Sequence, residues 1–225
     1  MSRRNPIRRR EEARRWPRRH PTRLFRDILQ VGLLFRLFWI GYKLEVRGRN
    51  NLRIVNRPCL VISNHCMHLD WSMLLRTLPF RFRRRTAVAA AADDIYGNRL
   101  RGFTSSLLGN SFAFDTGGSG TRESLEAVLA LLESRYSVIL FPEGELTTDG
   151  PMKPFKAGAG WIAQKSGVDV LPIRIDVVRK GIFEGRWRWW PRGHVRVTVG
   201  PPIRVPAELS YDETARLLQQ AVVDA

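Results

Sequence analysis

Two short apolar segments, each followed at once by reactive side chains, constrain the fold of this chain most. Residues 60–62 lead into His65 and Asp70, and residues 138–141 lead into Glu143. Unbroken apolar runs of this length are typical of strands that are buried on both faces of a parallel sheet. In an open α/β sheet, functional groups collect beyond the carboxyl ends of the strands. The sequence therefore predicts an α/β sheet with a site where these two strands end.

The rest of the chain alternates apolar runs with amphipathic segments. Leucines and a valine between residues 125 and 132 recur at helical spacing, which predicts a helix packed on the sheet. Residues 210–213 form a capping-box pattern that opens a last helix. We therefore predict a mixed α/β fold over residues 45–225, with a largely parallel central sheet flanked by helices. Further strands are expected at residues 87–91, 170–175 and 195–199, and a tightly packed helix start at residues 158–163.

His65 and Asp70 are the candidate catalytic pair. Five residues on a regular helix correspond to a rotation of about 140°, so a working pair requires a turn between them. A strand end that leads into a helix at residues 71–76 supplies such a turn. A neutral imidazole oriented by a carboxylate is a general base near neutral pH and can take a proton from a hydroxyl. The alternative is that Asp70 only caps the helix.

Two other chemistries fit the same segment less well. A metal site would use His65, His68 and Asp70, but the two histidines align only on a continuous helix, which the turn opposes. A nucleophilic Cys66 would need an activated thiolate, and cysteine is often just a small buried apolar residue. Cys59 and Cys66 are also too few for a disulfide framework, which fits a reducing compartment.

Four motifs occur in an order and spacing that resemble one protein family. They are Asn-His-x-x-x-x-Asp at residues 64–70, Phe-Pro-Glu-Gly at 141–144, Phe-Lys-Ala-Gly-Ala at 155–159 and Leu-Pro-Ile at 171–173. Over residues 46–203 the chain is similar to the glycerolipid acyltransferases, the lysophosphatidate acyltransferase group in particular. The resemblance implies a glycerol-3-phosphate acyltransferase-like fold. It also implies that His65 is the base that activates an acceptor hydroxyl and that Asp70 supports it.

The resemblance also points to substrate-binding residues. In the family, the Phe-Pro-Glu-Gly block helps to form the acceptor site. The residues that match this block here are Phe141, Pro142, Glu143 and Gly144.

Two positions depart from the family pattern. The family block usually continues Thr-Arg-Ser, and Leu146 stands at its arginine position. A second family block reads Phe-Ile-Asp-Arg. In this chain Asp115 stands at its aspartate position and Thr116 at its arginine position. A phosphate-bearing acceptor needs cationic donors. Lys156, the best placed by motif, and Arg122, Arg99 and Arg101 are the expected substitutes, although Arg122 also fits a solvated position in a first helical turn.

The activity implied by the resemblance is O-acyl transfer at a membrane surface. The acyl chain would move from acyl-CoA or acyl-carrier protein to the hydroxyl of a lysophospholipid. The default acceptor is 1-acyl-glycerol-3-phosphate, which gives phosphatidate. A different lipid or glycolipid acceptor is the alternative because of Thr116 and Leu146. We expect no metal and no bound cofactor, since none is needed for this transfer.

The amino-terminal region predicts contact with an anionic membrane surface. Eleven arginines and two glutamates give residues 1–26 a net charge of +9 out of the +17 of the whole chain. We predict a basic, disordered tail over residues 1–27, without the features of a secretory signal. Residues 28–44 follow as an apolar, amphipathic helix with Arg36 near its centre, which favours a helix lying on the membrane over one spanning it. The alternative is a helix packed on its own domain.

These features predict a membrane-associated protein on the cytoplasmic face. Residues 185–192, rich in tryptophan and arginine, fit either a further membrane contact or a surface hairpin with arginines stacked on indoles. The high net charge also allows a basic nucleic-acid-binding protein. That alternative leaves the four ordered motifs unexplained, so no nucleic-acid partner is expected.

Overall fold

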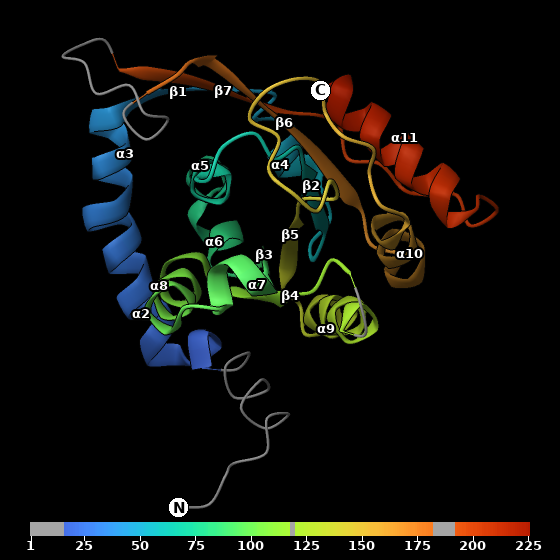
Figure 1. Cartoon of the computed structure of the whole chain (residues 1–225), viewed down its shortest axis with the longest axis horizontal. Coiled ribbons are helices and arrows are strands. Elements are labelled where there is room, and N and C mark those ends of the chain that lie inside the picture. Colours follow the sequence, from blue (N-terminus) through green and yellow to red (C-terminus); the bar gives the residue numbers. More distant parts are fainter. Residues whose placement is uncertain (1–15, 118–119, 182–191) are drawn as a thin grey trace, which may run out of the picture.

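The computed structural model describes residues 16–117, 120–181 and 192–225, and a seven-stranded sheet forms its centre (Figure 1). The predicted mixed, largely parallel sheet flanked by helices is confirmed. The strands run in the order β1-β7-β6-β2-β5-β3-β4, and every neighbouring pair is parallel except β6 and β7. Their bounds are β1 Tyr42–Arg47, β2 Leu60–Ser63, β3 Thr86–Ala91, β4 Ser111–Phe114, β5 Ser137–Leu140, β6 Val170–Arg179 and β7 Gly193–Val199.

Strand β2 lies in the middle of the sheet, between β5 and β6. Leu60 pairs with Val138 on one side and with Val170 on the other. Because these strands are parallel, their carboxyl ends meet at one edge of the sheet. The segments after β2 and β5, which carry the predicted site residues, therefore lie side by side.

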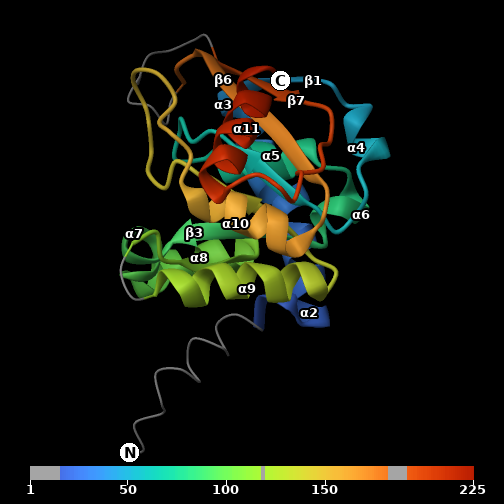
Figure 2. The same cartoon turned by 90° about the vertical axis from the view of Figure 1, so that its right-hand side faces the viewer.

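Helices cover both faces of the sheet, and β2 alternates between them. Val61 belongs to the cluster that includes α5 and α6, whereas Leu60 and Ile62 belong to the cluster that includes α9, α10 and α11. Figure 2 shows α9, α10 and α11 on the face turned to the viewer. The bounds of the covering helices are α4 Asn51–Ile54, α5 Asp70–Thr77, α6 Phe80–Arg83, α7 Ala92–Tyr96, α8 Arg99–Gly109, α9 Thr121–Glu133, α10 Ala157–Ser166 and α11 Tyr211–Val223.

The amino-terminal helical region differs from the prediction. A 3₁₀ turn at Trp16–Arg18 is followed by α2 (His20–Leu29), a π-helical turn at Gln30–Leu34 and α3 (Phe35–Gly41). The predicted tail of residues 1–27 was therefore wrong for residues 16–27, while residues 1–15 lie outside the described part. The predicted helix of residues 28–44 also ends early, because β1 begins at Tyr42 and pairs with β7.

Tertiary contacts explain why this basic segment is helical. The Arg26 side chain is buried and donates to the carbonyl oxygen of Pro17 at 2.9 Å. The carboxylate of Asp27 lies 2.7 Å from the guanidinium of Arg84, which follows α6. Arg26 and Asp27 thus each have one partner in the folded domain, which offsets part of the cost of burying them, while Arg26 Nη2 and Asp27 Oδ1 are buried without a hydrogen bond.

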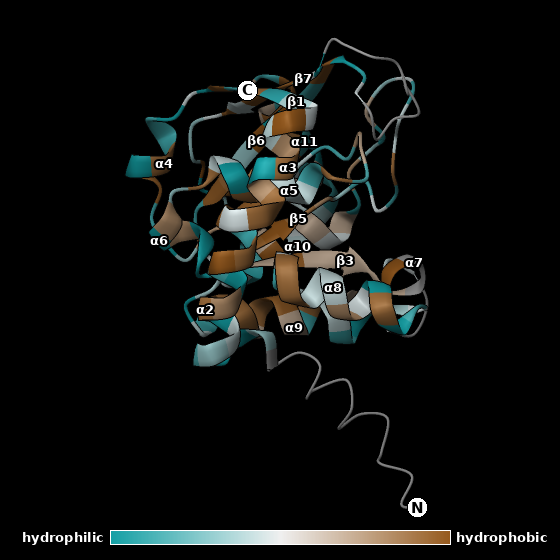
Figure 3. Cartoon of the chain, turned by 90° about the vertical axis from the view of Figure 1, so that its left-hand side faces the viewer, coloured by the Kyte–Doolittle hydropathy of each residue, from teal (hydrophilic) through white to brown (hydrophobic). Residues whose placement is uncertain are grey.

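The outer side of α2 and α3 carries exposed apolar side chains. Figure 3 faces these helices and colours them by hydropathy. Within the described residues, no helix combines the length and apolar character needed to cross a membrane. We call the following set the apolar helix surface: Leu24, Phe25, Ile28, Val31, Leu33, Leu37, Trp39 and Ile40.

Most of the other predicted elements are confirmed. The strands expected at residues 87–91, 170–175 and 195–199 are β3, β6 and β7, and the predicted helices around residues 71–76 and 125–132 are α5 and α9. The capping box that opens α11 is present, because Ser210 and Glu213 exchange hydrogen bonds between side chain and backbone. The tryptophan-rich segment lies outside the described residues apart from Arg192, whose guanidinium stacks 4.5 Å over Trp39.

Strands β1 and β4 were not predicted. Both lie at the edges of the sheet, and both include half-buried residues rather than a continuous apolar run. β1 carries Lys43, Glu45 and Arg47 on a strand paired on one side only. Edge strands lack the double burial that makes central strands recognisable in sequence.

Gly160 holds α10 tightly against α11, as the predicted small-residue helix start required. A Cβ atom at Gly160 would lie 2.1 Å from the carbonyl oxygen of Tyr211. We expect Gly160→Ala to lower the free energy of unfolding by about 1–3 kcal/mol or more, because the two helix backbones must separate. The measurement is urea denaturation followed by circular dichroism.

Gly32→Ala is the matched control for this prediction. A Cβ at Gly32 would meet no atom within 4 Å, so the same change in an exposed helical position should be neutral or stabilise by up to about 1 kcal/mol. Equal stability of the two variants would contradict the close packing of α10 on α11.

Candidate active site

The structure brings His65 and Asp70 together across a turn. β2 ends at Ser63 and α5 begins at Asp70, so the intervening residues reverse direction as the spacing required. His65 Nδ1 lies 2.9 Å from Asp70 Oδ2. The Asp70 side chain is fully buried, whereas the His65 side chain is 25% exposed. The imidazole is therefore held by a buried carboxylate and remains accessible.

Asp70 stabilises the turn rather than capping the helix. Its Oδ2 atom accepts hydrogen bonds from the backbone amides of Cys66 at 2.7 Å and Met67 at 3.0 Å. The N-cap residue of α5 is Leu69, which has no capping side-chain bond, so the alternative role of Asp70 as a helix cap was wrong. Burial raises the pKa of Asp70, and the hydrogen bonds from His65 and the two amides oppose that rise by stabilising the carboxylate.

The second nitrogen of His65 is left for chemistry. With Nδ1–H donated to Asp70, the neutral ring carries its lone pair on Nε2. The ring also stacks on Phe141, with ring centroids 4.5 Å apart and an interplanar angle of 25°. Phe141 thus contacts the imidazole directly and restricts its rotation.

Glu143 joins the loop after β5 to the loop after β2. Its buried carboxylate accepts hydrogen bonds from the amide of His65 at 2.7 Å, the hydroxyl of Thr147 at 2.9 Å and the amide of Lys153 at 2.9 Å. The amide of Thr147 in turn donates to the carbonyl oxygen of His65 at 2.8 Å. Glu143 therefore positions the backbone that carries His65.

The sequence analysis assigned no role to two residues of this framework, Thr147 and Asn64, although Asn64 opens the motif at residues 64–70. Thr147 contacts both Glu143 and His65, and the only signal was a hydroxyl four residues after the glutamate. Asn64 pairs with the backbone of Ile175 in β6, accepting at 2.8 Å and donating at 2.9 Å. Asn64 directly precedes His65, so this pairing fastens the end of β2 to its neighbour.

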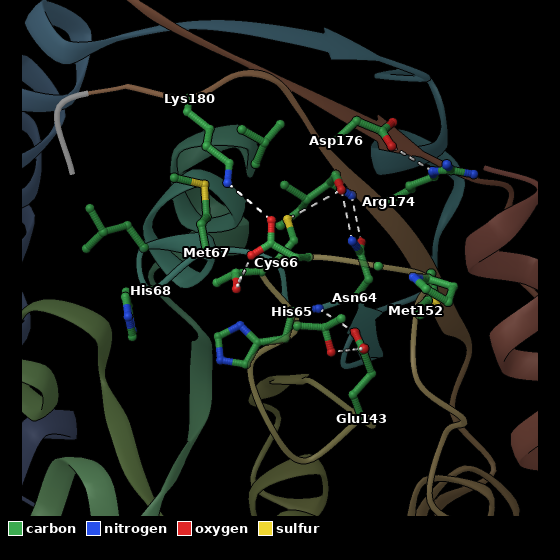
Figure 4. Close-up of a pocket in the computed structure, with 18 residues that line it drawn as sticks. Asn64, His65, Cys66, Met67, His68, Glu143, Met152, Arg174, Asp176 and Lys180 are labelled. Carbon is green, nitrogen blue, oxygen red and sulfur yellow. Dashed lines mark hydrogen bonds and ion pairs between the residues drawn. The ribbon is translucent and has the colours of Figure 1, made fainter. Parts of the chain in front are cut away.

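His65 lies between two cavities of different character. The polar cavity has a volume of about 600 Å³ and contains charged side chains from the loop after β5 and from β6, including Asp149, Arg174, Asp176 and Lys180. Figure 4 shows this cavity, with His65 and Glu143 on one side and Lys180, Arg174 and Asp176 on the other. Its charged groups are paired, Lys180 with Asp149 at 3.3 Å and Arg174 with Asp176 at 2.9 Å.

The apolar cavity extends from the other side of His65. Its volume is about 220 Å³, and it lies between α8, the ends of β3 and β4, and the Phe141–Leu146 segment. Both Thr116 and Leu146, which stand at the family's arginine positions, line it. Its apolar lining residues include Trp71, Val88, Ile95, Phe114, Leu140 and Phe141.

Gly144 and Lys156 lie against each other at the turn after β5. Gly144 has φ +77°, and a Cβ there would lie 2.6 Å from Lys156 Nζ. The Lys156 amine also donates to the carbonyl oxygen of Thr116 at 3.3 Å, and its amide donates to that of Pro142 at 3.0 Å. The structure thus places a lysine next to Thr116, where the family pattern has an arginine.

Arg122 and Asp115, two further substrate-binding candidates, lie at the amino end of α9 and just after β4. Arg122 is exposed on α9 and pairs with Glu126 at 3.0 Å. The backbone amide of Asp115 donates to the hydroxyl of Ser124 at 3.0 Å. Like Pro142 and Lys156, neither residue lines the polar or the apolar cavity, whereas Phe141, Glu143 and Gly144 do. Within the described residues, no group of three His, Cys, Asp or Glu side chains could hold a metal ion.

The chain is similar in sequence to known acyltransferases. A family model described as Acyltransferase matches residues 43–176. The chain is 29% identical over 183 residues to a chloroplastic 1-acyl-sn-glycerol-3-phosphate acyltransferase of Brassica napus, covering 80% of this chain and 51% of that protein. It is 31% identical over 193 residues to the human 1-acyl-sn-glycerol-3-phosphate acyltransferase alpha, covering 84% of this chain and 65% of that protein.

The fold comparison extends over almost the whole chain. The crystal structure of the 1-acyl-sn-glycerophosphate acyltransferase from Thermotoga maritima has a TM-score of 0.59 and 22% identity, covering 96% of this chain and 82% of that one. It shares the fold of the chain described above. The chain spans about half to two thirds of the length of the two curated relatives. With the family model matching more than half of its residues, the chain belongs to the acyltransferase family.

Proposed function

We propose that this protein is a membrane-surface O-acyltransferase that uses an acyl-CoA or acyl-carrier-protein thioester as donor and a lysophospholipid hydroxyl as acceptor. The observation that carries the proposal is the position of His65, whose Nε2 is free of Asp70 and whose side chain lines both cavities. A base placed between a polar and an apolar cavity fits a reaction that joins a polar acceptor to an acyl chain.

The proposed reaction needs one base and its carboxylate partner. His65 Nε2 takes the proton of the acceptor hydroxyl while the hydroxyl oxygen attacks the thioester carbonyl carbon. Asp70 stabilises the imidazolium that forms, because its buried carboxylate already accepts from Nδ1–H. The tetrahedral intermediate then expels the thiolate, which receives the proton from His65, leaving an ester and a free thiol. These steps use no metal and no bound cofactor.

We assign the acyl chain to the apolar cavity and the polar parts of the substrates to the polar cavity. The apolar lining of the first, with Trp71, Ile95 and Phe114, favours burial of a hydrocarbon chain. The second contains side chains of both charges and opens beside the Glu143 loop. Both assignments follow from the complementarity of each lining to one part of the substrates.

The acceptor we propose first is 1-acyl-glycerol-3-phosphate, with phosphatidate as product. The names of the relatives from Brassica napus and human support it. Lys156 supplies one cation beside Thr116. A different lipid or glycolipid acceptor is the second candidate, because the uncharged Thr116 and Leu146 line the apolar cavity next to His65.

We expect His65→Ala to lower the rate of acyl transfer by about 100- to 10,000-fold, the usual contribution of a general base. The measurement is thiol release from acyl-CoA, with lysophosphatidate and a panel of phosphate-free lipid alcohols as acceptors. His194→Ala is the matched control, since that histidine pairs with Glu45 on β1, away from both cavities. Substantial turnover by His65→Ala would contradict the assignment of the base.

The acceptor panel separates the two candidates. Release that depends on His65 and occurs only with lysophosphatidate supports the first acceptor. A phosphate-free acceptor that reacts faster supports the second. If no acceptor promotes release from acyl-CoA, the same assay is repeated with an acyl-carrier-protein thioester.

The proposed mechanism gives Cys66 no chemical role, and the reactivity of its thiol toward an alkylating reagent tests that absence of a role. Burial, followed by the charge of Asp70, raises the pKa of Cys66, and burial raises that of Cys59 to about 12. A raised pKa leaves less thiolate, by about a thousandfold at pH 8 for Cys59 relative to an ordinary thiol. We expect both cysteines to be alkylated by iodoacetamide at pH 8 far more slowly in the native protein than in urea, as read by mass spectrometry. Rapid native alkylation of Cys66 together with loss of transfer would favour a thiol nucleophile.

We further propose that the apolar helix surface lies in the headgroup layer of an anionic membrane, on the cytoplasmic face. Leu33, Trp39 and Ile40 are more than half exposed, and such a concentration of exposed apolar side chains marks an interaction surface. Neighbouring arginines, including Arg36, would add attraction to anionic lipids. A substrate with an acyl chain would then reach the site from the bilayer.

We expect Leu33→Gln combined with Ile40→Gln to weaken binding to anionic vesicles by about 100-fold or more, because burial of each such side chain contributes about 1.5–3 kcal/mol, and each 1.4 kcal/mol is about tenfold in affinity. The measurement is vesicle co-sedimentation. Ile54→Gln combined with Val178→Gln is the control, since both residues are exposed but lie outside the apolar helix surface. Equal loss in both double variants would argue against this surface as the membrane contact.

A further inference from the structure

A further hollow, separate from the two cavities beside His65, lies at the edge of the sheet opposite the active site. Its volume is about 560 Å³, and it lies next to the amino ends of β2, β3 and β5. The side chains of four arginines line it: Arg57, Arg81, Arg85 and Arg135. We call this hollow the arginine pocket. His65 follows the carboxyl end of β2, so the two sites are separated by the length of the strand.

The positive charge of this pocket is not balanced by its own lining. No aspartate or glutamate is among the lining residues. The four arginines take part in no ion pair with a described residue, in contrast to Arg84, which pairs with Asp27. The carboxylate of the neighbouring Asp169 is already used, because it accepts from Asn56 at 2.8 Å and pairs with Arg204 at 2.9 Å.

The fold holds the backbone of these arginines in place. The carbonyl oxygen of Arg85 accepts from the amide of Ser137 at 2.8 Å, which ties the start of β3 to the start of β5. Arg135 has φ +63°, a left-handed conformation at the end of α9. The guanidinium of Arg57 lies 5.4 Å over the ring of Phe82. Only Arg81 lies in a helix, whereas the other three arginines lie in the turns that precede β2, β3 and β5. Four exposed like charges are thus gathered around one hollow, at a Coulombic cost that a bound anion would offset.

We infer that the arginine pocket binds a phosphate-bearing anion. Guanidinium groups pair with phosphate oxygens through two parallel hydrogen bonds, and the bias toward arginine over lysine here fits that geometry. The pocket is concave and open to solvent, so it suits a terminal phosphate group rather than a buried ligand. It requires no reaction and is independent of the transfer chemistry assigned to His65.

The surroundings of the pocket indicate two sources for such a phosphate. Helix α6, which contributes Arg81, lies against the amino-terminal helices: Arg83 stacks 4.9 Å over Phe35, and Arg84 pairs with Asp27. Helix α6, which lines the pocket, therefore lies beside the elements that carry the apolar helix surface; Figure 3 shows α6, α2 and α3 in one view. An anionic lipid headgroup is one source, and a soluble phosphate compound is the other.

Removal of two guanidinium groups from the pocket tests the inference. The variant is Arg81→Gln combined with Arg85→Gln in the full chain, and the probe is phosphatidylcholine vesicles that contain phosphatidate. We expect it to bind these vesicles about 30-fold more weakly than the parent protein. This fold-change corresponds to about 2 kcal/mol of binding free energy, the contribution of two basic residues. Arg99→Gln combined with Arg101→Gln is the charge-matched control. Those two arginines are exposed on α8, which also packs on α2, but they do not line the pocket. We expect the control to lose less than about 3-fold.

A second arm of the experiment uses soluble anions. Inorganic phosphate and pyrophosphate are titrated into each variant by calorimetry, and unchanged thermal unfolding confirms that each variant is folded. Loss of vesicle binding confined to the pocket variant assigns the site to a lipid headgroup. If the pocket variant binds vesicles as before but no longer binds soluble anions, the site is assigned to a soluble phosphate compound. Equal behaviour of the pocket variant and the control in both arms overturns the inference, because only diffuse charge would then be acting.

Discussion

The buried carboxylate of Asp70 is the constraint on which the site depends. An unpaired charge in the core would cost several kcal/mol, and here three donors offset that cost: His65 Nδ1 and the amides of Cys66 and Met67. The same hydrogen bonds shape the turn and orient the imidazole. Loss of any one donor would therefore disturb the other two, so the turn and the catalytic pair form one structural unit.

The parallel sheet determines what surrounds that unit. β2 lies between β5 and β6, so the segment after it is fastened on one side by Glu143 and on the other by the pairing of Asn64 with Ile175. The two cavities lie on opposite sides of His65 because β6 brings charged residues to one side, whereas β3 and β4 bring mostly apolar residues to the other. The division between polar and apolar substrate parts that we propose thus follows from strand order.

The arginines of this chain are used in several different ways. Arg26 is buried and bonded to backbone, Arg84 forms an ion pair with Asp27, and Arg192 stacks on Trp39. By contrast, the lining of the arginine pocket contains four arginines and no carboxylate. The net charge alone indicated only an anionic partner, and the distribution of partners within the fold separates structural arginines from those available to an anion.

The sequence by itself determined the elements that are buried on both faces and the local turn chemistry. The central strands, the helix of residues 125–132, the capping box at Ser210 and the His65–Asp70 pair all follow from short-range patterns. Only the tertiary structure decided the edge strands β1 and β4, the helix in the basic segment, and the contacts of Thr147 and Asn64. The physical reason is the range of the interactions. Spacing and propensity act within a few residues, whereas burial of Arg26 and bonding of Glu143 to His65 require partners that only the folded sheet brings together.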